Sequence, residues 1–157
     1  LKFNGPRSFF TPLDFGLVGF SFACGLGVKL AKPNIPVFSL MGDGGFGMTI
    51  AELSTAVQHN INTITLVMNN NSWGAEKAYQ RDFFNKRYIG ADIKSPPFHE
   101  LAELYGAKGY YVNKLVNLEK IIKKALNCKK PVVINIEMDP DALYSFRRDS
   151  FKHKNIK

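Results

Sequence analysis

Apolar and polar positions divide the chain into short apolar runs separated by segments with helical spacing. Continuous apolar runs, typical of strands buried on both faces of a sheet, occupy residues 37–41, 63–68, 109–112 and 131–137. Between them, apolar residues recur every three or four positions, as on the buried side of a helix. Strands that alternate with helices predict α/β architecture. We therefore expect a doubly wound parallel sheet with helices on both faces.

The helices expected from this spacing cover residues 16–31, 48–59, 98–105 and 117–127, with Asn117 as a cap for the last one. Glycines predict a turn at residues 42–47. The polar and aromatic stretch up to about residue 95 carries no predicted helix or strand. We expect one domain over residues 1–138 and an irregular, basic C-terminal tail over residues 139–157.

Composition narrows the class of protein only moderately. The chain has 157 residues and a formal net charge of +8, with basic residues concentrated toward the C-terminus. We interpret them as a solvated basic face rather than a nucleic-acid site, because no RNA-recognition or zinc-finger motif accompanies them. No apolar run approaches the roughly 20 residues needed to span a bilayer. The two cysteines, Cys24 and Cys128, suit reduced thiols in a cytoplasmic protein.

Two loops that leave consecutive strands carry candidate chemistry. One is the glycine-rich loop at residues 42–47, and the other is the asparagine-rich loop at residues 69–74. In doubly wound folds, ligands bind beyond the carboxyl ends of the strands. Glycines let backbone amides approach a phosphate. Asp43 could reach an ion that bridges two phosphates, and Asn70 could add a neutral oxygen. Magnesium and calcium prefer such carboxylate and amide oxygens as ligands.

Other interpretations of these loops use fewer of the residues. Gly42, Gly44 and Gly47 formally match the dinucleotide fingerprint, but Asn69 and Asn70 stand where that fingerprint needs an acidic residue. The lysine-containing P-loop pattern is absent. A glycine turn and an asparagine cap without a ligand remain possible for either loop alone. A non-catalytic nucleotide-binding module therefore stays open, as does a basic nucleic-acid-binding domain.

Gly42-Asp43-Gly44 followed by Asn69-Asn70 resembles the motif of the thiamine-diphosphate enzymes, which include acetolactate synthases and pyruvate decarboxylases. The resemblance implies the thiamine-diphosphate-binding fold, with Mg²⁺ bound by Asp43, the Asn70 side chain and the Ser72 carbonyl. It implies that the Gly44 and Gly45 amides contact the diphosphate. The cofactor-binding residues expected from this resemblance are Gly16, Val18, Gly42, Asp43, Gly44, Gly45, Asn70, Ser72, Trp73 and Gly74.

Two of these residues belong to an upstream turn. Gly16-Leu17-Val18-Gly19 resembles the turn that meets the aminopyrimidine ring in these enzymes. The resemblance implies that the Gly16 carbonyl accepts a hydrogen bond from the 4′-amino group, and that Val18 is the wedge that bends the cofactor.

A narrower resemblance concerns the substrate. Residues 6–9, 73–87 and 146–149 are similar to the sulfoacetaldehyde acetyltransferase family, which converts sulfoacetaldehyde and phosphate to acetyl phosphate and sulfite. Both substrates are anions, which basic side chains would attract. The candidate side chains are Lys77, Arg81, Arg147 and Arg148. An acetolactate synthase-like enzyme or a decarboxylase subunit is the alternative within the same class.

In thiamine-diphosphate enzymes, a glutamate from a separate pyrimidine-binding domain activates the cofactor. We interpret Glu52 as a residue of this domain's own helix and not as that glutamate, and we assign no catalytic residue within this chain. The resemblance therefore implies a pyrimidine-binding domain, on the same or a partner chain, in a homodimer or tetramer. It also predicts that this chain alone is inactive.

Overall fold

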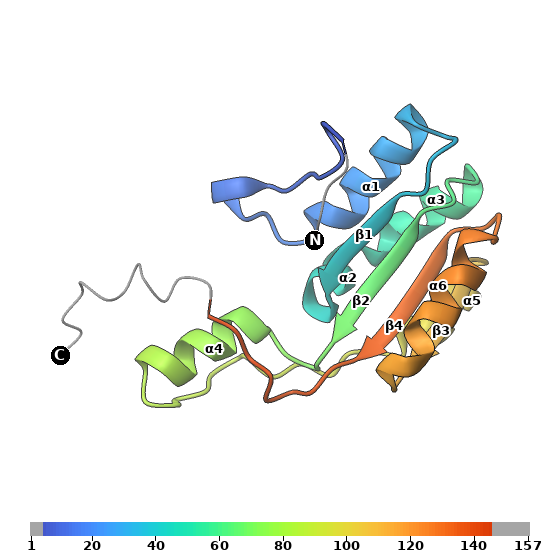
Figure 1. Cartoon of the computed structure of the whole chain (residues 1–157). Helices are drawn as coiled ribbons and strands as arrows, with labels where there is room; N and C mark the ends of the chain where they lie inside the picture. The colour runs from blue at the N-terminus through green and yellow to red at the C-terminus, as the bar shows by residue number, and fades with distance from the viewer. Residues whose placement is uncertain (1–4, 146–157) are drawn as a thin grey trace.

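The computed structural model describes residues 5–145, except for the side chain of Asp14. Four parallel strands form one sheet in the order β1-β2-β4-β3 (Figure 1). The strands are β1 (Phe38–Gly42), β2 (Ile64–Asn69), β3 (Lys108–Val112) and β4 (Val132–Glu137). They lie within one or two residues of the expected runs, because continuous apolar segments specify strands that are buried on both faces.

Helices cover both faces of this sheet. They are α1 (Phe20–Ala31), α2 (Asp43–Thr49), α3 (Leu53–Gln58), α4 (Gly74–Phe83), α5 (Phe98–Leu104) and α6 (Leu118–Leu126), with short 3₁₀ turns η1 (Leu13–Phe15), η2 (Ile50–Glu52) and η3 (Leu115–Asn117). In Figure 1, α6 lies over the sheet and α4 lies beyond the arrowheads of the strands. Within residues 5–145, no helix has the length and apolar character needed to cross a membrane.

The side chains of the two central strands, β2 and β4, alternate between two apolar cores. On one face, Val67 and Val133 pack with buried residues of α1, α2, α3 and α5. On the other face, Ile64 and Ile134 pack with α6. The doubly wound parallel fold expected from the apolar runs is therefore confirmed, and it places the carboxyl ends of β1 and β2 side by side.

The predicted glycine turn at residues 42–47 is wrong, because α2 begins at Asp43 and contains three of those glycines. Glycine costs a helix about 1 kcal/mol relative to alanine, so the local sequence disfavours this helix. Phe46 is fully buried and offsets that cost. Its ring meets Phe22 and Phe98 edge to face, with centroid distances of 5.3 and 5.1 Å. Burial of such a ring contributes roughly 1.5–3 kcal/mol.

Other predicted boundaries also need correction. The single helix expected at residues 48–59 is divided among α2, η2 and α3. Helix α4 lies in a stretch for which no element was predicted, although the spacing of Ala75, Ala78 and Tyr79 is helical. Asn117 precedes α6, but its side chain makes no capping hydrogen bond. Residues 139–145, at the start of the predicted tail, form neither helix nor strand.

Candidate functional site

The candidate site lies where β1 and β2 end. The two strands run in parallel with Gly42 opposite Met68, so Asp43 and Asn69 leave the sheet at the same edge. Asp43 is the first residue of α2, and Asn70 directly follows β2. The fold therefore brings the glycine-rich and asparagine-rich segments together at one edge of the sheet.

Asp43 is almost fully buried, with 1% of its surface exposed. Its Oδ2 accepts a 2.6 Å hydrogen bond from Ser95 Oγ. Its Oδ1 is buried and has no hydrogen-bond partner among the described residues. A buried carboxylate oxygen without a donor is costly, and a bound cation would remove that cost. The residues present therefore fit a metal ion at Oδ1.

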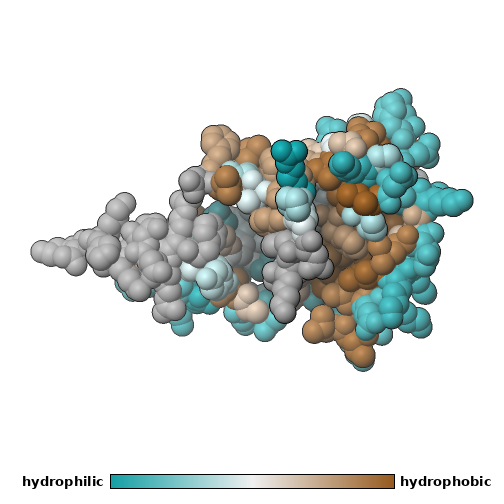
Figure 2. All heavy atoms as spheres, turned by 45° about the horizontal axis from the view of Figure 1, so that its top comes forward, coloured by the Kyte–Doolittle hydropathy of each residue, from teal (hydrophilic) through white to brown (hydrophobic). Residues whose placement is uncertain are grey.

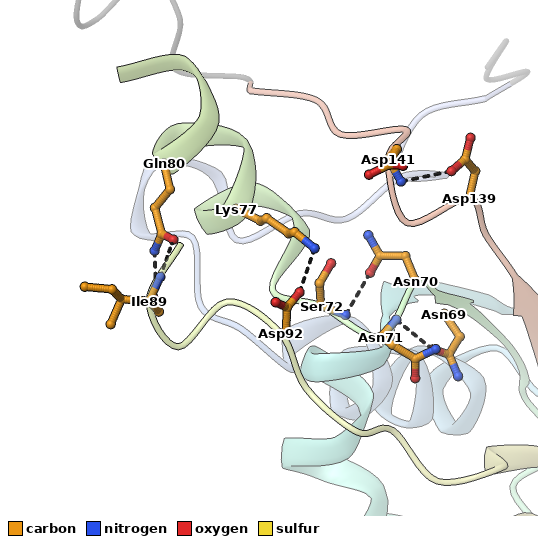
Figure 3. Close-up of polar contacts among 10 residues, drawn as sticks. All are labelled: Asn69, Asn70, Asn71, Ser72, Lys77, Gln80, Ile89, Asp92, Asp139 and Asp141. Atoms are coloured by element: carbon orange, nitrogen blue, oxygen red, sulfur yellow. Dashed lines mark hydrogen bonds and ion pairs between the residues drawn. The ribbon is translucent and has the colours of Figure 1, made fainter. Parts of the chain in front are cut away.

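The asparagine-rich loop is shaped by its own side chains (Figure 3). Asn69 Oδ1 accepts from the Asn71 amide at 3.1 Å, and Asn70 Oδ1 accepts from the Ser72 amide at 3.2 Å. Such side-chain bonds to the backbone two residues ahead stabilise tight turns. Asn71 has a φ of 54°, a left-handed conformation that asparagine tolerates. Asn69 Nδ2 also donates to Asn135 Oδ1 at 3.1 Å.

A carbonyl oxygen has two lone pairs, so Asn70 Oδ1 can accept from Ser72 and still face an ion. Within residues 5–145, no group of three His, Cys, Asp or Glu side chains is placed to hold a metal ion. A metal at Asp43 would therefore need neutral oxygens, such as those of the Asn70 side chain and the Ser72 carbonyl. Magnesium accepts such oxygens together with phosphate.

The segment at residues 91–95 lies along the asparagine-rich loop. The Trp73 amide donates to the Ala91 carbonyl at 2.7 Å, and the Ile93 amide donates to the Asn71 carbonyl at 3.0 Å. Ser72 and Asp92 form an antiparallel bridge. This pairing brings Ser95 within hydrogen-bonding distance of Asp43. Sequence reasoning missed Ser95, because no local pattern signals a contact between residues so far apart in the chain.

Trp73 forms a wall of the site. Its ring lies so close to Gly44 that a Cβ at Gly44 would be 2.6 Å from it, so only glycine fits there without a shift. A Cβ at Gly74 would lie 3.0 Å from Asn70 Nδ2. A hollow of about 260 Å³ opens beside these residues, lined in part by Asp43, Gly44, Trp73 and Ser95. A larger hollow of about 510 Å³ lies away from them and is lined by residues of α6 and its two ends.

The upstream turn packs against α2. Val18 Cγ1 would lie 3.5 Å from a Cβ at Gly45, and a Cβ at Gly19 would lie 2.5 Å from Thr49 Cγ2. Gly16 closes η1 with a φ of 60°. The fold therefore places Val18 beside Gly45. Leu17 and Val18 are about half exposed, and Figure 2 shows apolar side chains at the surface on this side of the molecule.

The predicted anion-binding side chains are engaged with acidic or backbone groups where the structure describes them. Lys77 Nζ lies 2.6 Å from Asp92 Oδ1 (Figure 3). The hydrogen bond that Lys77 donates to Asp92 raises the Lys77 pKa above its usual 10.5. Arg81 bonds Asp82 at 2.7 Å and the Leu143 carbonyl at 3.2 Å. Arg147 and Arg148 lie outside the described residues.

Residues 1–136 match the sequence model of the family described as "Thiamine pyrophosphate enzyme, C-terminal TPP binding domain". The chain therefore belongs to the thiamine pyrophosphate enzymes, as a C-terminal cofactor-binding domain. The family predicted from the glycine and asparagine motifs is confirmed. Thiamine diphosphate, another name for the same cofactor, is thus the cofactor of the family.

Individual relatives differ in the substrates that they act on. The chain is 37% identical to a sulfoacetaldehyde acetyltransferase of Castellaniella defragrans, over 96% of this chain and 26% of that protein. It is 33% identical to a probable acetolactate synthase large subunit of Methanococcus aeolicus, over 99% of this chain and 26% of that protein. The chain thus spans about a quarter of the length of these relatives.

A solved structure has the same fold. It is the Rhodococcus jostii RHA1 thiamine diphosphate-dependent 4-hydroxybenzoylformate decarboxylase, which matches with a TM-score of 0.74 and 29% sequence identity. The match covers 79% of this chain and 24% of the decarboxylase chain.

Proposed function

We propose that the protein containing this chain is a thiamine-diphosphate-dependent enzyme that converts sulfoacetaldehyde and phosphate to acetyl phosphate and sulfite. The observation that carries the cofactor site is the buried, unpartnered Oδ1 of Asp43 beside the Asn70 turn. The similarity to a sulfoacetaldehyde acetyltransferase supports the choice of substrate.

The chain's own residues would bind and orient the cofactor. Thiamine diphosphate, when bound, supplies a nucleophilic carbon that attacks the substrate carbonyl. Asp43 Oδ1, the Asn70 side-chain oxygen and the Ser72 carbonyl would hold Mg²⁺ against the diphosphate. The glycines of α2 would let the diphosphate approach the backbone. Val18, which packs beside Gly45, would support the bent cofactor, and the Gly16 carbonyl would accept from its aminopyrimidine.

Lys77 is one described candidate for binding an anionic substrate, and Figure 3 shows its side chain beside Asp92 and Ser72. Its side chain is 16% exposed, whereas that of its partner Asp92 is 70% exposed. An incoming sulfonate or phosphate could therefore compete for the lysine while Asp92 turns to solvent. Arg81, Arg147 and Arg148 are the other candidates for this role.

The activating glutamate would come from a pyrimidine-binding domain on the same or a partner chain, within a homodimer or tetramer. The exposed apolar side chains of Leu13, Phe15 and Leu17, in the segment just before Val18, support contact with such a domain. We therefore expect no turnover from residues 1–157 alone. Acetyl phosphate formation by this purified chain, without any partner, would contradict the need for that domain.

The substrate is tested by incubating the full-length protein with thiamine diphosphate, Mg²⁺ and phosphate. Sulfoacetaldehyde should give sulfite and acetyl phosphate in equal amounts, and pyruvate should give neither carbon dioxide nor acetolactate. Turnover of pyruvate alone would instead favour the alternative enzyme, an acetolactate synthase or decarboxylase. That alternative is kept because of the 33% identity to the probable acetolactate synthase.

A non-catalytic nucleotide-binding module is the alternative outside the enzymes. Calorimetry on the same protein should show Mg²⁺-dependent binding of thiamine diphosphate and much weaker binding of NAD or ATP. Equal binding of the three compounds would contradict the proposed cofactor site.

A further inference from the structure

The hydroxyl group of Ser95 is the only donor that the structure gives to the Asp43 carboxylate among the described side chains, at 2.6 Å from Oδ2. Ser95 belongs to neither the glycine-rich nor the asparagine-rich motif. It lies in the connection between α4 and α5, just before Pro96 and Pro97. A residue outside both motifs therefore touches the principal candidate metal ligand.

The Ser95 bond makes the two oxygens of Asp43 unequal. Oδ2 is occupied by the hydroxyl, whereas Oδ1 is buried and has no partner among residues 5–145. A carboxylate rotates about its terminal torsion unless its neighbours fix it. With Oδ2 held by Ser95, the orientation of the group is set and Oδ1 is the oxygen left for a cation.

Ser95 is itself held by the asparagine-rich loop. Its amide donates to Asn71 Oδ1 at 3.3 Å, and the Ile93 amide donates to the Asn71 carbonyl at 3.0 Å. Asn71 directly follows Asn70, the second candidate ligand. One chain of hydrogen bonds thus runs from the asparagine-rich loop through Ser95 to Asp43, and it links the two loops that would share one ion.

We propose that Ser95 is a positioning residue for the metal site: its hydroxyl orients Asp43 so that Oδ1 faces the ion, and its amide keeps that hydroxyl in register with Asn70. The inference rests on the proposed function, in which Asp43 and Asn70 hold the metal. Hydrogen bonds to a ligating group orient it, and their loss typically lowers metal affinity about 10- to 100-fold.

The test measures metal binding directly in the full-length protein. Mn²⁺ replaces Mg²⁺, thiamine diphosphate is saturating, and the dissociation constant and spectrum of bound Mn²⁺ are read by electron paramagnetic resonance. Ser95→Ala should weaken Mn²⁺ binding about 10- to 100-fold and alter the spectrum of the bound ion. Ser95→Thr, which keeps the hydroxyl, should bind Mn²⁺ much as the unmodified protein does.

Ser54→Ala is the matched control. Ser54 is an exposed residue of α3 whose Oγ donates to the Ala51 carbonyl at 2.8 Å, so its truncation removes one hydrogen bond without touching Asp43. It should leave Mn²⁺ affinity unchanged. Circular dichroism and thermal melts on every variant would establish that each one is folded.

The outcomes separate the role of Ser95 from the proposed function. If the unmodified protein binds Mn²⁺ with thiamine diphosphate and Ser95→Ala binds it equally well, the role of Ser95 is overturned and the cofactor site stands. Equal losses in Ser95→Ala and Ser95→Thr would overturn the role of the hydroxyl. If the unmodified protein shows no metal-dependent binding of thiamine diphosphate, the cofactor site itself fails, and the role of Ser95 fails with it.

Discussion

The start of α2 and the connection around α4 face the same site but are built differently. Phe46 fixes α2 inside the apolar core, and Asp43 is buried beside it. In the region of α4, by contrast, the loop at residues 84–90 is exposed, with Ile89 exposed by 81%, and polar bonds such as those between Gln80 and the Ile89 backbone hold it. Asn85 and Lys86 there adopt positive φ angles of 51° and 59°. We therefore expect the segment that begins α2 to be held more rigidly than the loop at residues 84–90.

Removal of the buried Phe46 ring should have the largest effect on the stability of the protein. Phe46→Ala should destabilise the protein by about 3–5 kcal/mol, because it leaves a cavity between Phe22 and Phe98. Chemical denaturation measures the loss. Leu104→Ala, which truncates a side chain exposed by 83%, is the control and should change stability by less than about 0.5 kcal/mol. Similar losses in both variants would show that α2 is not fixed by its core.

The connection after α4 should respond more weakly. Gln80 bonds the Ile89 backbone twice, donating to its carbonyl at 3.0 Å and accepting from its amide at 2.8 Å (Figure 3). Gln80→Ala should cost about 1–3 kcal/mol, since each of the two bonds contributes roughly 0.5–1.5 kcal/mol net. Hydrogen exchange at Ile89 should accelerate, while exchange in β2 stays slow. Gln80→Glu keeps only the acceptor and should give an intermediate rate. Unchanged exchange in Gln80→Ala would contradict a role for Gln80 in holding the Ile89 backbone.

The ion pair of Lys77 and Asp92 should matter least for stability. Lys77→Met should cost no more than about 1 kcal/mol at neutral pH, because Asp92 is largely exposed and solvent screens the pair. The Lys77 pKa is raised in the folded state. The ion pair therefore contributes to the free energy of unfolding below pH 10.5, and this contribution is lost as the pH rises through the higher pKa of the folded state. Unfolding measured from pH 7 to 11 should therefore show the two proteins converging at high pH. A stability gap that widens above pH 10.5 would contradict this assignment.

The sequence predicted the parts of the molecule that depend on local pattern. The runs at residues 63–68 and 131–137 gave central strands because each is apolar on both faces. The motif residues Asp43 and Asn70 came together because consecutive parallel strands end at one edge. Only tertiary packing makes a helix of the glycine-rich residues after Gly42, so the turn predicted there was wrong. The bond between Ser95 and Asp43 has no local signature at all.

We expect Asp43 to hold the metal ion that binds thiamine diphosphate. Calorimetric titration of thiamine diphosphate into full-length Asp43→Asn, with and without Mg²⁺, tests it most directly, because asparagine keeps the shape of the side chain and removes its charge. Mg²⁺ should strengthen binding in the unmodified protein and fail to do so in the variant. The loss should exceed the roughly 100-fold limit expected for a residue that only orients a ligand. Equal Mg²⁺-dependent affinities in the two proteins would contradict the claim.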